Sequence, residues 1–266
     1  DATFFRAKLA GADFSGADAY RAKFYLANLA ETRFDKARLA EADLTEADLS
    51  GASLHQADLR GAKLVGSKLR GADLTGANLR GADLFRADLS GASLERAFGE
   101  RATLHGASLA GAILKNAKMD EANASAADFS GAKARSSVWT RANFQRASLR
   151  HADFRNADLT EANFTAAVLT DACLNYARLD GAILTRAILS SADLSDARLH
   201  RVRLSDAVLD NACLEGADLT EADLEFLDLA DVRLEDANLT RAHMTGSRLP
   251  RASLRAAILK QAGLAD

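Results

Sequence analysis

The sequence has little of what usually marks an enzyme, a metal site or a membrane anchor. Only two of its 266 residues are cysteine, and no apolar run approaches the roughly 18 residues of a membrane-spanning helix. Glycine-rich phosphate loops, CxxC pairs and HExxH motifs are all missing. The five histidines are spread over different positions of the repeat described below. We therefore expect a protein that is not an enzyme, holds no metal or cofactor and has no membrane-spanning segment.

What the sequence has in abundance is a five-residue repeat. Residues 72–96 read ADLTG ANLRG ADLFR ADLSG ASLER, and the same phase runs along the whole chain without insertion or deletion. We label the large apolar position i; it falls at every residue number ending in 4 or 9, in 53 repeats. Position i holds 38 Leu, 8 Phe, 2 Met and 1 Trp, while position i−2 holds 46 Ala. Such regularity along the full length predicts a solenoid.

The composition of each repeat predicts its local structure. Positions i−2 and i are apolar and i−1 is polar, which is the alternation of a very short strand. Of the 17 glycines, 15 lie at i+2, where a type II turn requires a positive φ. The pattern predicts strands centred on i−1 and corners at i+1 and i+2. It also predicts type II corners between Gly51 and Gly111, and a different geometry at corners without glycine, such as Glu161 and Asp171.

The motif A(D/N)LXX, present at 72–74 and 77–79, resembles that of the pentapeptide-repeat family over essentially all 266 residues. The resemblance implies an all-β fold, a right-handed quadrilateral β-helix with four repeats and 20 residues per coil, in about 13 coils. Phenylalanines that recur every ten residues, in 4–34 and 144–164, fit opposite walls of a four-sided coil. Neither end carries a polar cap, so we expect residues 1–266 to be a single β-helix cut from a longer protein.

The apolar position i is interrupted at Ala19, Gly99, Ala124 and Ala134. At Gly99 two arrangements are open: Phe98 swings inward to fill the hole, or it stays exposed beside a small cavity. In 122–141 two alanines offset Phe129 and Trp139 at position i. Dense packing therefore predicts that Trp139 belongs to the core.

Two surface features are candidates for binding a partner, and each could instead be ordinary surface. The first is an apolar stripe along one predicted edge, at spacings of about 20 residues or its multiples. It consists of Phe5, Tyr25, Leu26, Val65 and Phe85. The second is an acidic band with a net charge of −10, in a chain whose net charge is −3, which could contact a basic partner. It consists of Asp206, Asp210, Glu215, Asp218, Glu221, Asp223, Glu225, Asp228, Asp231, Glu235 and Asp236, against Arg233 alone.

The two cysteines, Cys173 and Cys213, both occupy position i−1 and are 40 residues apart. With 20 residues per coil, their Cα atoms should lie about 9.6 Å from each other. That separation is too long for a disulfide. We expect free surface thiols in a reducing compartment, either the cytoplasm or an effector delivered from it.

The family's roles suggest two functions. Some members look like duplex DNA and bind DNA gyrase; others form spacers or docking surfaces in secreted effectors. The gyrase-binding members are strongly acidic along one face and often carry a projecting loop, whereas this chain is mildly charged and has no insertion. We expect a non-enzymatic rigid scaffold or protein-interaction module within a larger bacterial protein, which contacts a protein partner or a flanking domain and no nucleic acid. The alternative is a DNA-mimicking gyrase-binding protein that gives inhibition or drug protection.

Overall fold

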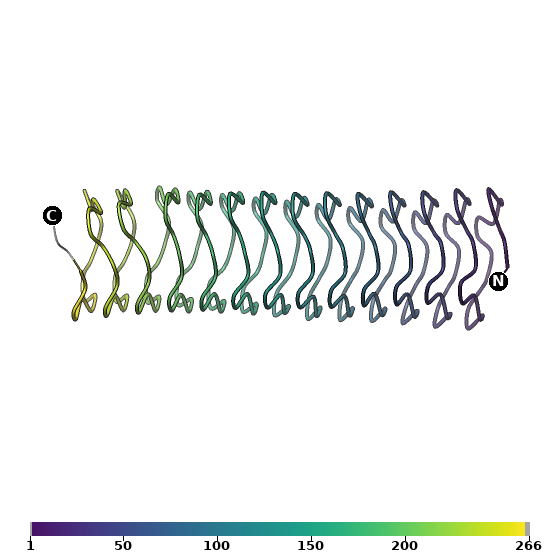
Figure 1. Ribbon diagram of the computed structural model, residues 1–266, viewed down its shortest axis with the longest axis horizontal. Coiled ribbons are helices and arrows are strands. Elements are labelled where there is room, and N and C mark those ends of the chain that lie inside the picture. Colours follow the sequence, from purple (N-terminus) through teal and green to yellow (C-terminus); the bar gives the residue numbers. More distant parts are fainter. Residues whose placement is uncertain (1, 264–266) are drawn as a thin grey trace.

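The computed structural model describes residues 2–263, which wind into one straight rod with the chain ends at opposite tips (Figure 1). The strands are single bridge residues at every position i−1, from Thr3 to Gly263, and each is separated from the next by a two-residue turn. This agrees with the expected all-β class. Within 2–263 there is no helix, and so none that is long and apolar enough to cross a membrane.

The coils are joined by a ladder of parallel bridges with a register of 20 residues. Thr3 pairs with Lys23, and Lys23 pairs in turn with Asp43. Four columns of bridges therefore run along the rod, starting at Thr3, Lys8, Asp13 and Asp18. Two backbone hydrogen bonds support a typical bridge: Phe4 N–H donates to the Lys23 carbonyl at 2.7 Å, and Lys23 N–H donates to the Ala2 carbonyl at 2.9 Å. The ladder satisfies the backbone groups that the narrow coils would otherwise leave unpaired.

The corners differ from the sequence prediction. Position i+2 has a positive φ at 37 non-glycine residues as well as at 15 glycines. Glu161 has a φ of 58° and Asp171 a φ of 55°, so the expectation that these corners depart from the glycine corners is wrong. Each corner is closed by a hydrogen bond such as Ala162 N–H to the Leu159 carbonyl at 3.0 Å. The ladder imposes the left-handed conformation, and none of the 37 residues is the β-branched Val, Ile or Thr that tolerates it worst.

The interior is filled by positions i−2 and i, as the repeat predicts. From Ala22 to Met244 these side chains are almost all fully buried. Phenylalanine rings one coil apart stack face to face, as Phe4 does on Phe24 with centroids 4.8 Å apart. Rings ten residues apart meet edge-on, as Phe4 and Phe14 do at 5.9 Å. The core is thin in section, so each coil depends on packing against its neighbours.

Two interior irregularities are resolved by neighbouring residues. Phe98 stays outside, under Arg80 at 4.7 Å from the ring centroid, and the hole at Gly99 is filled by Met119 of the next coil. Trp139 is fully buried, as predicted. Its indole N–H donates to the Ser137 hydroxyl at 2.9 Å. Serine thus replaces alanine at i−2 where a buried indole needs an acceptor.

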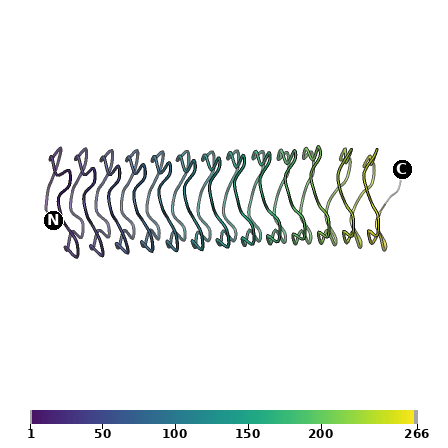
Figure 2. The ribbon, with the colours of Figure 1, turned by 180° about the vertical axis from the view of Figure 1, so that it is seen from behind.

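One rung of the ladder is missing. Among residues 2–263 the register predicts a bridge between Val208 and Asp228, and no bridge forms there. The hydrogen bonds that would join Leu209 N–H to the Asp228 carbonyl and Asp228 N–H to the Ala207 carbonyl are absent from this described part of the chain. Neighbouring windings stand further apart here along one side of the rod, while the opposite side keeps its even spacing (Figure 2). We call the facing segments 205–211 and 225–231 the ladder gap.

The ladder gap has a cause in the sequence. Leu227 occupies position i−2, where Ala207 and Ser247 precede and follow it in the same column, and its side chain is buried. Valine is tolerated at this position: bonds beside Val202 measure 2.9–3.0 Å, and those beside Val232 lengthen to 3.1–3.2 Å. Because leucine needs still more room, 225–231 cannot approach 205–211 closely enough to pair. Ala207 is accordingly 7% exposed, although most of the interior is sealed.

A first prediction concerns the interior and outer positions of one repeat. Leu79→Ala should lower the free energy of unfolding by about 2–5 kcal/mol, because it leaves a cavity in a narrow core. Leu79→Asp should disrupt the neighbouring coils, since it places an unpaired charge in that core. Thr75→Ala, at an outward corner, should be nearly silent. Thermal unfolding of the three variants checks this, and equal melting temperatures for Leu79→Asp and Thr75→Ala would refute the assignment of faces.

A second prediction concerns Leu227, where truncation should act against the usual rule. Leu227→Ala should let the missing rung close, so it should leave the melting temperature unchanged or raise it. Hydrogen exchange should show the amides of Leu209 and Asp228 unprotected in the wild-type protein and protected in the variant. Leu229→Ala, at position i of the same repeat, is the matched control and should destabilise by about 2–5 kcal/mol. Equal destabilisation by both substitutions would show that Leu227 is an ordinary core residue.

Candidate interaction surfaces

The predicted apolar stripe lies along one edge of the rod. Phe5, Tyr25, Val65 and Phe85 all occupy corner position i+1 above one bridge column, and Leu26 follows Tyr25 at i+2. The rings of Phe5 and Tyr25 stack with centroids 5.7 Å apart. Phe5 is 52% exposed, whereas the other four are half-buried. The structure therefore brings these residues into one line, and their role in binding stays a prediction.

Cationic side chains border this stripe, which the sequence alone did not reveal. Arg6 lies over the Phe5 ring and Arg86 over the Phe85 ring, each 5.0 Å from the centroid. Phe85 also stacks on His105 at 5.6 Å. The signal was present in the sequence, because an arginine at i+2 directly follows each aromatic residue at i+1. A ligand of this edge would meet aromatic faces with arginines beside them.

Beyond His105 the same edge becomes a shallow polar groove with a serine and a histidine in contact. His105 Nδ1 lies 2.7 Å from the Ser125 hydroxyl, and that hydroxyl donates to Asn123 Oδ1 at 2.7 Å. Since the single hydroxyl proton goes to Asn123, the contact with His105 is one in which Nδ1–H donates. This arrangement does not make His105 a base that could activate Ser125 as a nucleophile.

Charged side chains on the surface are paired mostly along the rod. Most ion pairs join residues 20 apart, one coil to the next. Glu121 accepts from Arg101 at 2.7 Å and from Arg141 at 2.9 Å, on the coils before and after it. The hydrogen bond from Arg101 holds the pKa of the Glu121 carboxyl below its usual range. Exposed pairs of this kind contribute little to stability, but they neutralise the surface coil by coil.

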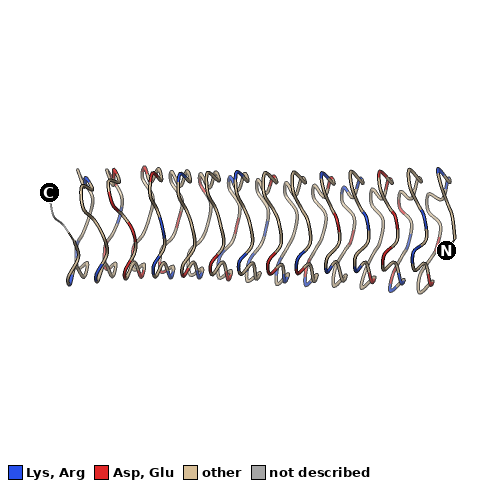
Figure 3. Cartoon of the chain, viewed as in Figure 1, with Lys and Arg blue, Asp and Glu red and all other residues tan. Residues whose placement is uncertain are grey.

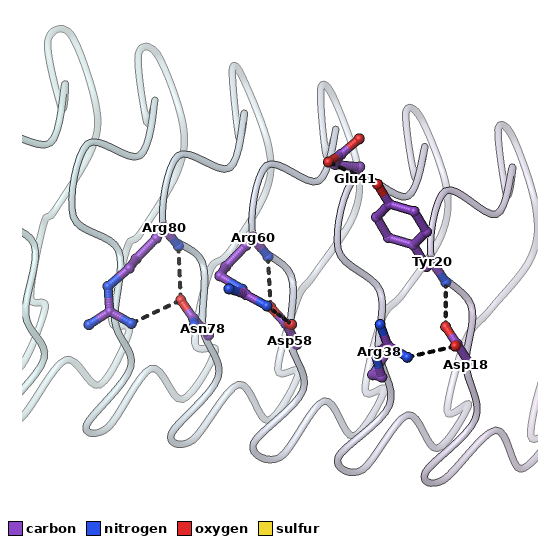
Figure 4. Close-up of polar contacts among 8 residues, drawn as sticks. All are labelled: Asp18, Tyr20, Arg38, Glu41, Asp58, Arg60, Asn78 and Arg80. Carbon is purple, nitrogen blue, oxygen red and sulfur yellow. Dashed lines mark hydrogen bonds and ion pairs between the residues drawn. The ribbon is translucent and has the colours of Figure 1, made fainter.

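The column that begins at Asp18 shows the same pairing at close range (Figure 4). Arg38 donates to Asp18 at 2.7 Å across one coil. Arg60 makes two hydrogen bonds, of 2.8 and 2.7 Å, to the carboxylate of Asp58. These charges already have partners, so this face offers few free ones to another protein.

The acidic band is a belt around the rod. Its residues fall in all four bridge columns and on the corners between them. Arginines outside the band reach into it: Arg186 pairs with Asp206 at 3.4 Å, Arg201 with Glu221 at 2.7 Å, and Arg251 with Asp231. Acidic and basic positions alternate along the rest of the rod (Figure 3). The linear count of −10 therefore overstates the charge that a partner would meet.

Neither the cysteines nor the acidic side chains assemble a metal centre. Cys173 and Cys213 are free and lie in one column with Asp193 between them. Burial is the main cause that raises the pKa of the Cys173 thiol. Within the residues that the structure describes, no group of three His, Cys, Asp or Glu side chains could hold a metal ion.

Comparison with known proteins identifies the repeat. The family model described as pentapeptide repeats (8 copies) matches the chain along nearly its whole length. The matched segments are 1–35, 22–61, 62–98, 100–133, 125–160, 147–186, 162–201, 187–225 and 228–264. No curated protein matches the chain.

Similar solved structures are also pentapeptide-repeat proteins. HetL, from the cyanobacterium Nostoc sp. Strain PCC 7120, is 34% identical, with 85% of this chain and 89% of that chain covered and a TM-score of 0.35. A trypsin-treated form of QnrB1, a plasmid-mediated fluoroquinolone resistance protein, is 23% identical over 70% of this chain and 90% of that one, with a TM-score of 0.37. TM-scores this low carry no residue correspondences. The match of the repeat itself is nonetheless continuous, and the chain belongs to the pentapeptide-repeat family.

Proposed function

We propose that this protein is a rigid, non-enzymatic scaffold that presents a docking edge to a protein partner or to a flanking domain. Its coils would form a right-handed quadrilateral β-helix of about 13 turns within a larger bacterial protein, kept in the cytoplasm or exported from it as part of an effector. The observation that carries the proposal is the stacked apolar stripe, Phe5, Tyr25, Leu26, Val65 and Phe85, on an otherwise polar and charge-paired rod.

Rigidity supports this proposal because a docking edge must keep its side chains in register. The interior is sealed from Ala22 to Met244, and the bridges repeat at every fifth residue with the single exception of the ladder gap. The ladder gap lies far along the chain from the stripe. Between Phe5 and Phe85 every bridge is present, so the stripe is carried by an uninterrupted part of the ladder.

The second candidate function is that of a DNA-mimicking gyrase-binding protein. A duplex mimic needs negative charge along one face for tens of ångströms, since DNA carries a charge every ~1.7 Å of its axis. The acidic band spans 31 residues, about one and a half coils or roughly 7 Å of rod. It also surrounds the rod and is partly neutralised by Arg186, Arg201 and Arg251. The arrangement of charge therefore favours the scaffold over the mimic.

The scaffold proposal predicts the effect of removing the stripe's rings. A variant with Phe5→Ser, Tyr25→Ser and Phe85→Ser should stay folded by circular dichroism but lose a partner that the wild-type rod captures from lysate of the source cell. A control variant with Tyr176→Ser and Ile258→Ser removes exposed apolar side chains elsewhere and should capture the same partner. Identical capture by all three proteins, measured by quantitative mass spectrometry, would count against the stripe as the docking edge.

The alternative function has its own test. At micromolar concentration the protein should neither inhibit gyrase supercoiling nor protect gyrase from a quinolone, because its acidic groups do not form a continuous stripe. Activity in either assay, if it disappears when Asp218, Glu221, Asp223 and Glu225 are replaced by their amides, would establish the mimic instead of the scaffold.

A further inference from the structure

We propose that the ladder gap is a docking site for a short, extended, basic segment of another protein, which would pair with the open backbone edges. This inference goes beyond the apolar stripe, since the ladder gap starts at residue 205 and the stripe ends at Phe85. Failure of the stripe to bind a partner would leave it untouched.

The first support is the set of backbone groups without a partner. In the described chain, four N–H donors that the register would pair across the gap make no backbone hydrogen bond: those of Asp206, Leu209, Asn211 and Asp228. The carbonyls that would accept them belong to Glu225, Asp228, Ala230 and Ala207. Donors and acceptors therefore remain on both edges in the alternation that an added strand requires.

The second support is that the opening is confined to one column of the ladder. On the adjoining walls, Arg203 still bridges to Asp223 and Cys213 to Arg233. The hydrogen bond from Leu204 N–H to the Asp223 carbonyl has lengthened to 3.1 Å, while that from Leu214 N–H to the Arg233 carbonyl is 2.8 Å. The gap is thus a wedge, closed on the flanking walls, and further separation would bend the rod about these intact columns without breaking it.

Charge determines what kind of segment suits the gap. The two edges carry five acidic residues and no lysine or arginine, namely Asp206, Asp210, Glu225, Asp228 and Asp231. Arginine reaches two of them from the outer coils, Arg186 to Asp206 and Arg251 to Asp231. In the described structure no ion pair or side-chain hydrogen bond crosses from 205–211 to 225–231. Like charges face each other there, so a cationic segment would replace repulsion by attraction.

The side chains at the edges set the register of such a segment. Val208 is 40% exposed at the centre of one edge and follows Ile188, at 37%, in its column. Phe226 is 76% exposed and lies against Gly246 of the next coil, so its ring leans away from the gap. An inserted strand would place an apolar residue beside Val208 and small residues toward the interior. Its basic residues would then lie at the two corners, near Asp206 and Asp210.

The experiment uses a fluorescein-labelled peptide with the core Lys-Ala-Val-Ala-Lys, and the whole protein. Anisotropy should show binding to the wild type that weakens as salt increases. A peptide with proline in place of the central valine keeps the charge and lacks the central N–H, so it should bind at least about tenfold more weakly. Hydrogen exchange should show protection of Leu209 and Asp228 amides when the first peptide is bound.

Two protein variants complete the test. Leu227→Ala closes the rung and should reduce affinity at least about tenfold, although every acidic residue is retained. Asp210→Asn with Glu225→Gln keeps the gap and should weaken binding and reduce its dependence on salt. Equal affinity for Leu227→Ala and wild type, or for the valine and proline peptides, would mean that the acidic surface alone attracts the peptide and would overturn the proposal. The absence of binding to the wild type at about millimolar peptide would also overturn it.

Discussion

The structure depends on one constraint: each coil must approach the next closely enough for backbone hydrogen bonds to form at a register of 20 residues. With a core only one side chain deep, the ladder has no second layer to support it, and its strands are single residues. Alanine at i−2 meets this constraint because it leaves room for the next coil. Leu227 shows the limit, since one larger residue at that position removes a rung.

The same constraint explains the corners. A left-handed conformation costs a non-glycine residue roughly 1–2 kcal/mol, yet the ladder holds it at 37 such positions. The hydrogen bonds on either side of each corner leave the backbone no other path. Glycine at i+2 therefore relieves a cost and does not define the turn. Side chains at these corners become available for surface interactions, as in the Arg101–Glu121–Arg141 series.

The fold was predictable from sequence because its cause is periodic. The face of every residue, the buried position of Trp139 and the free state of Cys173 and Cys213 all follow from a residue's place in the repeat. What could not be predicted depends on contacts between coils. Met119 filling the hole at Gly99, Ser137 accepting from Trp139 and the arginines that enter the acidic band each involve distances that no single repeat contains. The stripe was identified because it is periodic, whereas the ladder gap was missed because a conservative-looking leucine carries it.

The register of 20 residues also governs how the rod could change length during evolution. Loss or gain of a whole coil would keep every wall in place and would preserve the neighbours of almost every side chain. Loss of a single five-residue repeat would still leave an uninterrupted pattern of Ala and Leu, and the core would close. All later residues, however, would move round by one wall, so that Glu121 would no longer face Arg101 or Arg141, whichever of them lay across the deletion. Selection on the interior alone would accept steps of five residues, and selection on the surface would accept only steps of 20.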